Sequence, residues 1–260
     1  IIGTHALFQE GVAMQRLGLI IVDEQHRFGV EQRKALMAKA GHMPHVLSLT
    51  ATPIPRSLAL TLYGELDISI LKEKPAGRLP IATKLVSPVN RNRLYEAIRG
   101  EIESGRQAFV VCPTIESKDE GQESTGAAAE DVYDELQKKQ LKGFRIGLLH
   151  GRQKPVDKEA VMQQFIEHAL DVLVATTVIE VGVDVPNASI MVIESAERFG
   201  LAQLHQLRGR VGRGSEQSHC YMLLSDTKAP GKRLRAIESS NDGFKLAELD
   251  LDIRGPGAIY

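Results

Sequence analysis

The chain of 260 residues lacks several features that would place it in common protein classes. No apolar run reaches the ~18 residues that a membrane-spanning helix needs, so we expect no transmembrane segment here and no membrane partner. Only two cysteines are present, Cys112 and Cys220, each at or near the end of an apolar run. They predict small buried residues in a reducing compartment and exclude a disulfide framework. The formal net charge of −1 excludes binding to nucleic acid through bulk positive charge, so any strand must lie in a local groove.

What is present is typical of a soluble α/β protein. Hydrophobic residues make up 43% and charged residues 25% of the chain, and its length favours two domains. Short β-branched runs alternate with helical patterns, which predicts parallel sheets flanked by helices. Strands are expected at 19–22, 46–49, 109–111, 146–149, 172–174, 190–193 and 221–224. Helices are expected at 28–40, 53–64, 90–104, 127–140 and 157–168.

One stretch interrupts this alternation of strands and helices. Residues 72–80, Lys-Glu-Lys-Pro-Ala-Gly-Arg-Leu-Pro, combine charge with Pro and Gly and predict a linker. We therefore expect a partial first lobe over 1–71 and a complete second lobe over 81–226. Residues 227–260 are then the start of a charged, largely helical C-terminal segment. Because residues 19–22 are all apolar, we expect both faces of that strand to be covered.

Asp23 and Glu24 directly follow this first strand, ahead of Gln25 and His26. Ligands of α/β sheets meet the carboxyl ends of strands, so these side chains are expected in a crevice. An Asp there can hold Mg²⁺ through water, and the adjacent Glu can polarise an attacking water. A strand that ends in an ordinary acidic turn is the alternative, which these residues alone leave open.

A turn rich in hydroxyl groups follows the next strand. Thr50-Ala51-Thr52 comes directly after 46–49, and its two hydroxyls can bond a neighbouring carboxylate or His. Such bonds can couple the state of a bound nucleotide to another surface. The alternative is that one of these residues only caps the helix that Pro53 opens.

A second such turn follows the strand at 172–174. The hydroxyls of Thr176 and Thr177 can bind a backbone phosphate without any basic residue. Farther along the same loop, beyond Gly182, Asp184 can accept a hydrogen bond from a ribose hydroxyl. A plain strand-to-loop transition with a Gly turn remains the alternative.

The most specific element is the run 206–214, Gln-Leu-Arg-Gly-Arg-Val-Gly-Arg-Gly. Arginines separated by glycines present guanidinium groups on a compact backbone with few bulky neighbours. Arg210 and Arg213 can then neutralise charge on a transferring phosphoryl group, an effect that is worth ~10³–10⁵ in rate. An RNA-binding Arg/Gly tract is the alternative, but such tracts are disordered, whereas here a helix precedes and a strand follows.

The order of these segments resembles that of a superfamily 2 helicase, in which they correspond to motifs II, III, V and VI. The resemblance implies RecA-like parallel sheets flanked by helices, with ATP and Mg²⁺ as cofactors. It implies catalytic roles for Asp23, Glu24, Gln25, His26, Arg210 and Arg213, with Asp23 and Glu24 holding Mg²⁺ through water. Nucleotide contacts are implied for Gly182, Asp184, Gln206 and Gly209, and coupling of the lobes for Thr50, Ala51 and Thr52. DNA contacts are implied for Gly3, Thr4, His150, Gly151, Arg152, Thr176 and Thr177.

Flanking signatures narrow the resemblance to the RecG family of bacterial branch-migration helicases, over essentially the whole chain. They are Asp-Glu-Gln-His-Arg-Phe-Gly-Val at 23–30, Leu-Tyr-Gly-Glu-Leu-Asp at 62–67, Pro-Ala-Gly-Arg at 75–78 and Cys-Pro-Thr-Ile-Glu at 112–116. Residues 249–257 resemble that family's translocation motif, which implies such a role for Asp250, Arg254, Gly255 and Gly257. The implied protein is a cytoplasmic, nucleoid-associated DNA translocase that remodels stalled forks and Holliday junctions in recombination and repair. The related Mfd family, which displaces DNA-bound protein, is the alternative; it usually has Glu in place of Gln25 and Ala in place of Pro256.

One motif of such motors is missing from these residues. No Gly-x-x-x-x-Gly-Lys-[Ser/Thr] loop holds the nucleotide phosphates, since Gly231-Lys232 is followed by Arg233. The wedge domain of RecG is also absent, and the opening Ile1-Ile2 is typical of a cut inside a domain. We expect the 260 residues alone to bind nucleotide weakly and not to hydrolyse ATP. We also expect the open sheet edge of the first lobe to be poorly ordered or to pair with a second copy. A non-catalytic module that binds DNA or a partner remains the alternative.

Overall fold

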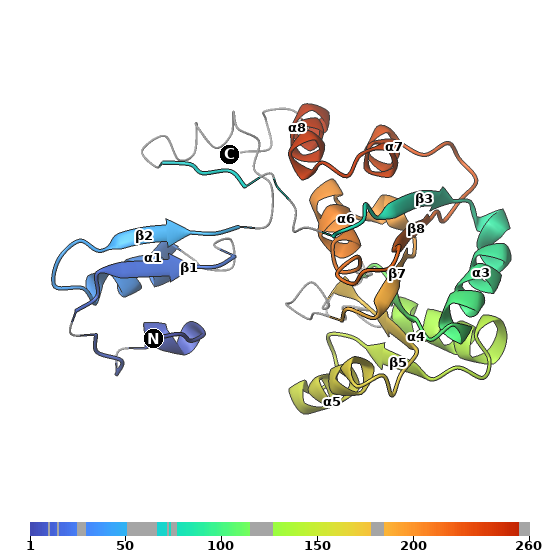
Figure 1. Ribbon diagram of the computed structural model, residues 1–260, viewed down its shortest axis with the longest axis horizontal. Coiled ribbons are helices and arrows are strands. Elements are labelled where there is room, and N and C mark those ends of the chain that lie inside the picture. The colour runs from blue at the N-terminus through green and yellow to red at the C-terminus, as the bar shows by residue number, and fades with distance from the viewer. Residues whose placement is uncertain are drawn as a thin grey trace, which may run out of the picture. The chain divides into compact units, whose positions relative to one another are not determined.

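The computed structural model describes residues 1–9, 11–14, 16–24, 30–50, 67–71, 73, 77–114, 127–177 and 185–254. The chain divides into two compact units, Ile1–Pro53 and Ile54–Tyr260 (Figure 1). The expected helix at 53–64 and part of the expected linker at 72–80 lie outside the described residues, so the linker and the lobe boundaries stay predictions. Outside them too lie Gln25, His26, Ala51, Thr52, Gly182, Asp184, Gly255 and Gly257.

The first unit is built on a pair of parallel strands, β1 (Leu19–Val22) and β2 (His45–Ser48), with α1 (Val30–Ala38) between them in sequence. A short 3₁₀ turn, His5–Phe8, precedes β1. The register aligns Val22 with Ser48, so both strands end at the same level. Both strands expected in this unit are thereby confirmed, the second with bounds one residue earlier than predicted.

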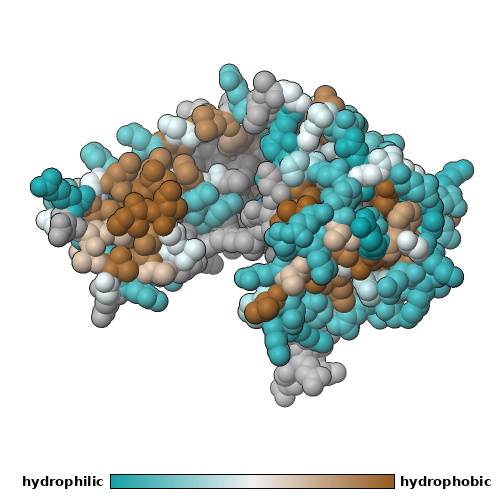
Figure 2. Space-filling model, turned by 60° about the horizontal axis from the view of Figure 1, so that its bottom comes forward, coloured by the Kyte–Doolittle hydropathy of each residue, from teal (hydrophilic) through white to brown (hydrophobic). Residues whose placement is uncertain are grey.

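Only one face of β1 is covered. Ile20 and Val22 are buried and cluster with Leu36 of α1. Since side chains alternate along a strand, Leu19 and Ile21 face the other way, and they are 56% and 57% exposed. The expectation that both faces of this strand are buried is therefore wrong. Figure 2 shows hydrophobic surface over this unit, and Val46 and Leu47 of β2 are also about half exposed.

The second unit contains a six-stranded sheet in which every pairing is parallel, in the order β3-β8-β7-β4-β6-β5. Its central strands β4, β6 and β7 have every residue buried, as strands covered on both faces do. The bounds of the strands are β3 Ala82–Val86, β4 Gln107–Val111, β5 Ile146–Leu149, β6 Val172–Ala175, β7 Ala188–Ile193 and β8 His219–Leu223.

Helices cover both faces of this sheet (Figure 1). Phe109 and Val111 of β4 belong to a cluster formed with α5, α6, α7 and α8, whereas Ala108 and Val110 belong to one formed with α3 and α4. The alternation along one strand thus separates two cores. The helices are α3 Arg91–Glu103, α4 Ala127–Glu135 with a π turn at Leu136–Gln140, α5 Pro155–Ile166, α6 Leu201–Arg208, α7 Lys232–Ser239 and α8 Gly243–Arg254. Short 3₁₀ turns lie at Pro88–Asn90 and Ala196–Arg198.

This second unit confirms the predicted doubly wound α/β fold. The strands expected between 109 and 224 are β4 to β8, with bounds within two residues of the prediction. The sequence interpretation missed β3, an edge strand that is only partly buried and that carries the exposed Lys84. A short edge strand needs no continuous apolar run, because one of its sides faces solvent.

Both cysteines are free thiols in the interior, which confirms the prediction that they are buried. Cys112 follows β4 directly and Cys220 lies within β8. Burial raises the pKa of both thiols, that of Cys220 to about 12. Across the described part of the chain, no helix is long and apolar enough to span a bilayer.

Candidate functional site

The second unit places its candidate residues at two opposite edges of the sheet. All six strands run parallel, so all carboxyl ends meet at one edge and all amino ends at the other. The predicted DNA contacts His150 to Arg152 and Thr176 to Thr177 follow β5 and β6, at the carboxyl edge. Arg210 and Arg213 follow α6 and precede β8, at the amino edge. This last motif therefore follows a helix and precedes a strand, as the sequence predicted.

At the carboxyl edge, the loops after two neighbouring strands meet through hydroxyl groups. Thr114, after β4, and Thr177, after β6, have their Oγ1 atoms 3.4 Å apart. Thr176 is 1% exposed, and its Oγ1 has no hydrogen-bond partner among the described residues. Thr177 is therefore the better placed of the two predicted threonines for a phosphate. Thr114 was missed, although it lies in the loop after a strand, which is the same signal that found Thr177.

His150 is held in place from two sides. Its backbone N–H donates to Oε1 of Gln153 at 3.0 Å, and Gln153 Nε2 donates to the carbonyl of Leu148 at 3.0 Å. Its Nε2 lies 3.5 Å from Oε1 of Glu130, on α4. The ring is mostly buried, whereas the next two residues, Gly151 and Arg152, are exposed. The turn therefore presents Gly151 and Arg152 outward, with His150 as its internal support.

At the amino edge, the side chain of Arg208 is buried and forms hydrogen bonds inside the protein. It is 2% exposed, and its Nη1 donates to the carbonyls of Ile237 at 2.7 Å and Ser240 at 2.8 Å. Its Nη2 lies 3.0 Å from Nδ1 of His205. Burial lowers the pKa of this guanidinium. Arg208 thus fastens α6 to the end of α7, a role that the sequence interpretation did not assign.

The remaining arginines of this run are partly exposed. Arg210 and Arg213 flank Val211, which is 2% exposed and belongs to the core. Gln206 lies on α6 and Gly209 ends that helix, with its N–H donating to the carbonyl of His205 at 3.1 Å. Because the buried Val211 fixes the backbone between Arg210 and Arg213, the loop can hold both guanidinium groups in place near a phosphate.

In the first unit, the carboxylates and one predicted coupling residue share one edge. Asp23 and Glu24 follow β1 and Thr50 follows β2, and these parallel strands end at the same level. Glu24 has a left-handed backbone, φ 49°, and its N–H donates to Asp23 Oδ1 at 2.9 Å. Within the described residues no group of three acidic, His or Cys side chains forms a metal site, so Mg²⁺ stays a prediction. Gly3 and Thr4 are exposed ahead of the 3₁₀ turn at His5–Phe8.

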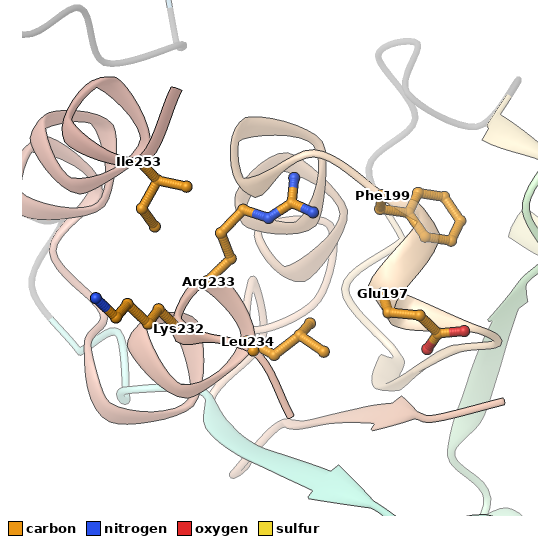
Figure 3. Close-up of a pocket in the computed structure, with 7 residues that line it drawn as sticks. Glu197, Phe199, Lys232, Arg233, Leu234 and Ile253 are labelled. Atoms are coloured by element: carbon orange, nitrogen blue, oxygen red, sulfur yellow. The ribbon is translucent and has the colours of Figure 1, made fainter. Parts of the chain in front are cut away.

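The end of the described chain is attached to the second unit. Asp250 and Arg254 lie on α8, which packs against α6 and α7, and Leu246 of α8 is buried in the core. A cavity of about 290 Å³ lies beside these helices (Figure 3). The residues that line it include Glu197, Phe199, Lys232, Arg233, Leu234 and Ile253. Since they include side chains of both charges, the cavity favours no single class of ligand.

Comparison with known proteins gives consistent matches. Residues 90–215 match the helicase conserved C-terminal domain family. The chain is 55% identical, over 99% of its length, to ATP-dependent DNA helicase RecG of Synechocystis, and 52% identical over its whole length to RecG of Escherichia coli K12. It covers 31% and 38% of these two proteins, so it spans about a third of the length of the curated relatives.

Solved structures agree with the sequence matches. A RecG bound to a three-way DNA junction superposes with a TM-score of 0.79 at 47% identity, covering all of this chain and 33% of that one. The DNA-bound helicase MrfA superposes with a TM-score of 0.61 over 86% of this chain and 33% of its own. At 20% identity, that second likeness shows the fold alone. The RecA-like helicase fold expected from the motif order is thereby confirmed.

Proposed function

This chain is a RecG-family sequence along its whole length, and on that premise we propose that it is part of an ATP-driven double-stranded DNA translocase. The protein remodels branched DNA, such as stalled forks and Holliday junctions. The observation that carries the proposal is the likeness of the entire chain to a RecG bound to a three-way DNA junction. Because the chain spans about a third of its relatives, the activity is proposed for the full-length protein.

DNA binding is proposed for the carboxyl edge of the second unit. Thr177, Gly151 and Arg152 lie at the ends of neighbouring strands, which suits contacts along a phosphate backbone. Thr114 joins them, because its hydroxyl meets that of Thr177. His150 and Thr176 contribute from beneath the surface. Gly3 and Thr4 of the first unit are proposed as further strand contacts.

Nucleotide hydrolysis is proposed for the two motifs with acidic and arginine side chains. Asp23 would hold Mg²⁺ through water and Glu24 would polarise the attacking water, with Gln25 and His26 assisting. Arg210 and Arg213 neutralise charge on the transferring phosphoryl group. The proposed nucleotide contacts are Gly182, Asp184, Gln206 and Gly209, the coupling residues are Thr50, Ala51 and Thr52, and the translocation residues are Asp250, Arg254, Gly255 and Gly257.

A pair of substitutions in the full-length protein tests these roles. Glu24→Gln is expected to abolish DNA-stimulated phosphate release and to leave ATP binding unchanged, because Glu24 acts on water. Arg213→Ala is expected to suppress hydrolysis and to spare DNA binding. The matched controls are the exposed Glu31→Gln and Arg235→Ala, each of which should behave as the unsubstituted protein. The roles are wrong if either test variant weakens nucleotide binding as much as it slows turnover.

The 260 residues by themselves are proposed to be inactive. Without a phosphate loop, the β- and γ-phosphates have neither a backbone cradle nor its Lys, and positioning is most of this catalysis. Purified chain should release phosphate at the background rate with or without branched DNA. Robust DNA-stimulated hydrolysis by this chain would contradict the proposal.

Self-association through the sheet of the first unit is also proposed. The outward side chains Leu19, Ile21 and Leu47 are each about half exposed, and such apolar strands favour pairing with another chain. Light scattering behind size exclusion should show a dimer of the 260-residue chain that Ile21→Lys reduces to a monomer. A monomer at all concentrations would refute this.

A further inference from the structure

The loop between α6 and β8, residues 209–218, carries Arg210 and Arg213 and is here called the arginine loop. It contains two glycines, Gly212 and Gly214, that leave no room for a side chain. Gly212 has a φ of +79°, and a Cβ built there would lie 2.9 Å from Cγ1 of Ile81 and 3.2 Å from its Cδ1. The backbone of the loop therefore rests directly on the side chain of Ile81.

The other glycine rests on a different segment. A Cβ built at Gly214 would lie 2.7 Å from the carbonyl oxygen of Pro186, a backbone atom that no side-chain rotation can move. Pro186 comes two residues after Asp184 in the chain. The arginine loop thus meets Ile81 at Gly212 and the backbone of Pro186 at Gly214.

Ile81 is itself tied to the far end of the same loop. Nε2 of Gln217 donates to the carbonyl of Pro80 at 2.8 Å, and the N–H of Ala82 donates to the carbonyl of Ser218 at 2.9 Å. The side chain of Ile81 packs against the core cluster that includes Val211. Residues 80–82 are therefore connected to the arginine loop at the point where the predicted linker, 72–80, ends.

We propose that Ile81 is a positioning residue that sets where the arginine loop lies and so where Arg210 and Arg213 meet the phosphates. This rests on the proposed function of the two arginines. The predicted linker ends at Pro80, so a displacement of the linker would reach the arginine loop through Ile81, whose side chain meets Gly212. Glycine at 212 is what allows the approach, because a larger residue would hold the loop away from Ile81.

The test compares Ile81→Ala with Leu85→Ala in the full-length protein. Both residues lie in or next to β3, are partly buried and pack against the same core cluster, and Ile81 is the one whose side chain meets Gly212 of the arginine loop. Misplacing a catalytic group by about 1 Å can cost ~10² in rate. Ile81→Ala should therefore lower kcat for DNA-stimulated ATP hydrolysis by about tenfold to a hundredfold, with the KM for ATP changed by less than about twofold.

Two further variants separate positioning from folding. Ile81→Val keeps the Cγ1 atom that meets Gly212 and should restore kcat to within about twofold of the unsubstituted protein. Leu85→Ala should lower thermal stability about as much as Ile81→Ala but leave kcat unchanged. Hydrogen exchange should also accelerate at amides 210–216 in Ile81→Ala and not in Leu85→Ala.

The outcomes distinguish this inference from the proposed function. If Arg213→Ala abolishes turnover while Ile81→Ala and Leu85→Ala have equal kcat values, the inference is overturned and the proposed function stands. If Arg213→Ala leaves turnover intact, the assignment of the arginines fails and the inference fails with it. A fall in kcat for Ile81→Ala that Ile81→Val does not show is the supporting result.

Discussion

The two units use the same kind of strand and bury it very differently. β1 of the first unit, Leu-Ile-Ile-Val, is as apolar as β6 of the second, Val-Leu-Val-Ala. Yet every residue of β6 is buried, whereas β1 alternates between buried and exposed residues and β2 has no buried residue at all. The difference lies in the neighbours, because β6 is flanked by β4 and β5 and covered by helices on both faces. An apolar composition therefore predicts that a segment forms a strand, but how deeply the strand is buried depends on the strands and helices that pack against it.

The largest expected consequence is a difference in local stability. Amides of β1 and β2 should exchange with solvent roughly a thousandfold faster than those of β6 and β7, which corresponds to ~4 kcal/mol. Hydrogen exchange with mass spectrometry on a monomeric sample measures both regions at once. Equal protection of the amides in residues 19–48 and 172–193 would show that the difference in burial between the two units causes no difference in local stability.

A pair of leucine truncations measures the same contrast from the side chains. Leu173 in β6 is fully buried, so Leu173→Ala should lower the free energy of unfolding by ~3–4 kcal/mol. Leu47 in β2 is 48% exposed, and in the monomeric Ile21→Lys background Leu47→Ala should cost less than ~1 kcal/mol. Urea unfolding followed by circular dichroism gives both values. A cost at Leu47 equal to that at Leu173 would mean that the outward face of β2 is covered in solution.

Arg208 tests how far the second unit depends on a polar group in its interior. Arg208→Ala leaves the carbonyls of Ile237 and Ser240 without their donor and should cost ~2–3 kcal/mol of unfolding free energy. The exposed Arg235→Ala on α7 is the control and should be close to neutral. Thermal unfolding of both variants provides the comparison. If the two unfold at the same temperature, the tie between α6 and α7 is not stabilising.

The smallest effect concerns a surface ion pair of the second unit. Burial acts to raise the pKa of Asp171, but hydrogen bonds from the side chain and backbone of Arg145 outweigh it and hold the pKa below its usual value of 3.8. A lowered pKa contributes stability above the unfolded value, and that stability is lost as pH falls through the folded value. Asp171→Asn should therefore cost ~0.5–1 kcal/mol at pH 7, and progressively less below about pH 4. A cost that does not change with pH would contradict the ion pair.

Sequence alone predicted most of the second unit, because each central strand is a continuous apolar run between turns. It missed β3, an edge strand that is only partly buried. It also overestimated the burial of β1, because the burial of a strand depends on which other elements pack against it and not on its own residues. In the candidate site, the arginines show the same limit. In the sequence, Arg208, Arg210 and Arg213 are alike, because each is directly next to a glycine. Only the fold shows that Arg208 reaches carbonyls 29 and 32 residues farther along the chain.

The burial of the two cysteines makes this chain convenient for site-specific labelling. Maleimide dyes react with the thiolate, and the raised pKa values of Cys112 and Cys220 keep both thiols protonated as well as out of reach. A cysteine introduced in place of exposed Arg152 or Gln217 would then be the single reactive thiol of the chain. Dyes at these two positions would report on the carboxyl and amino edges of the same sheet without removal of either native residue.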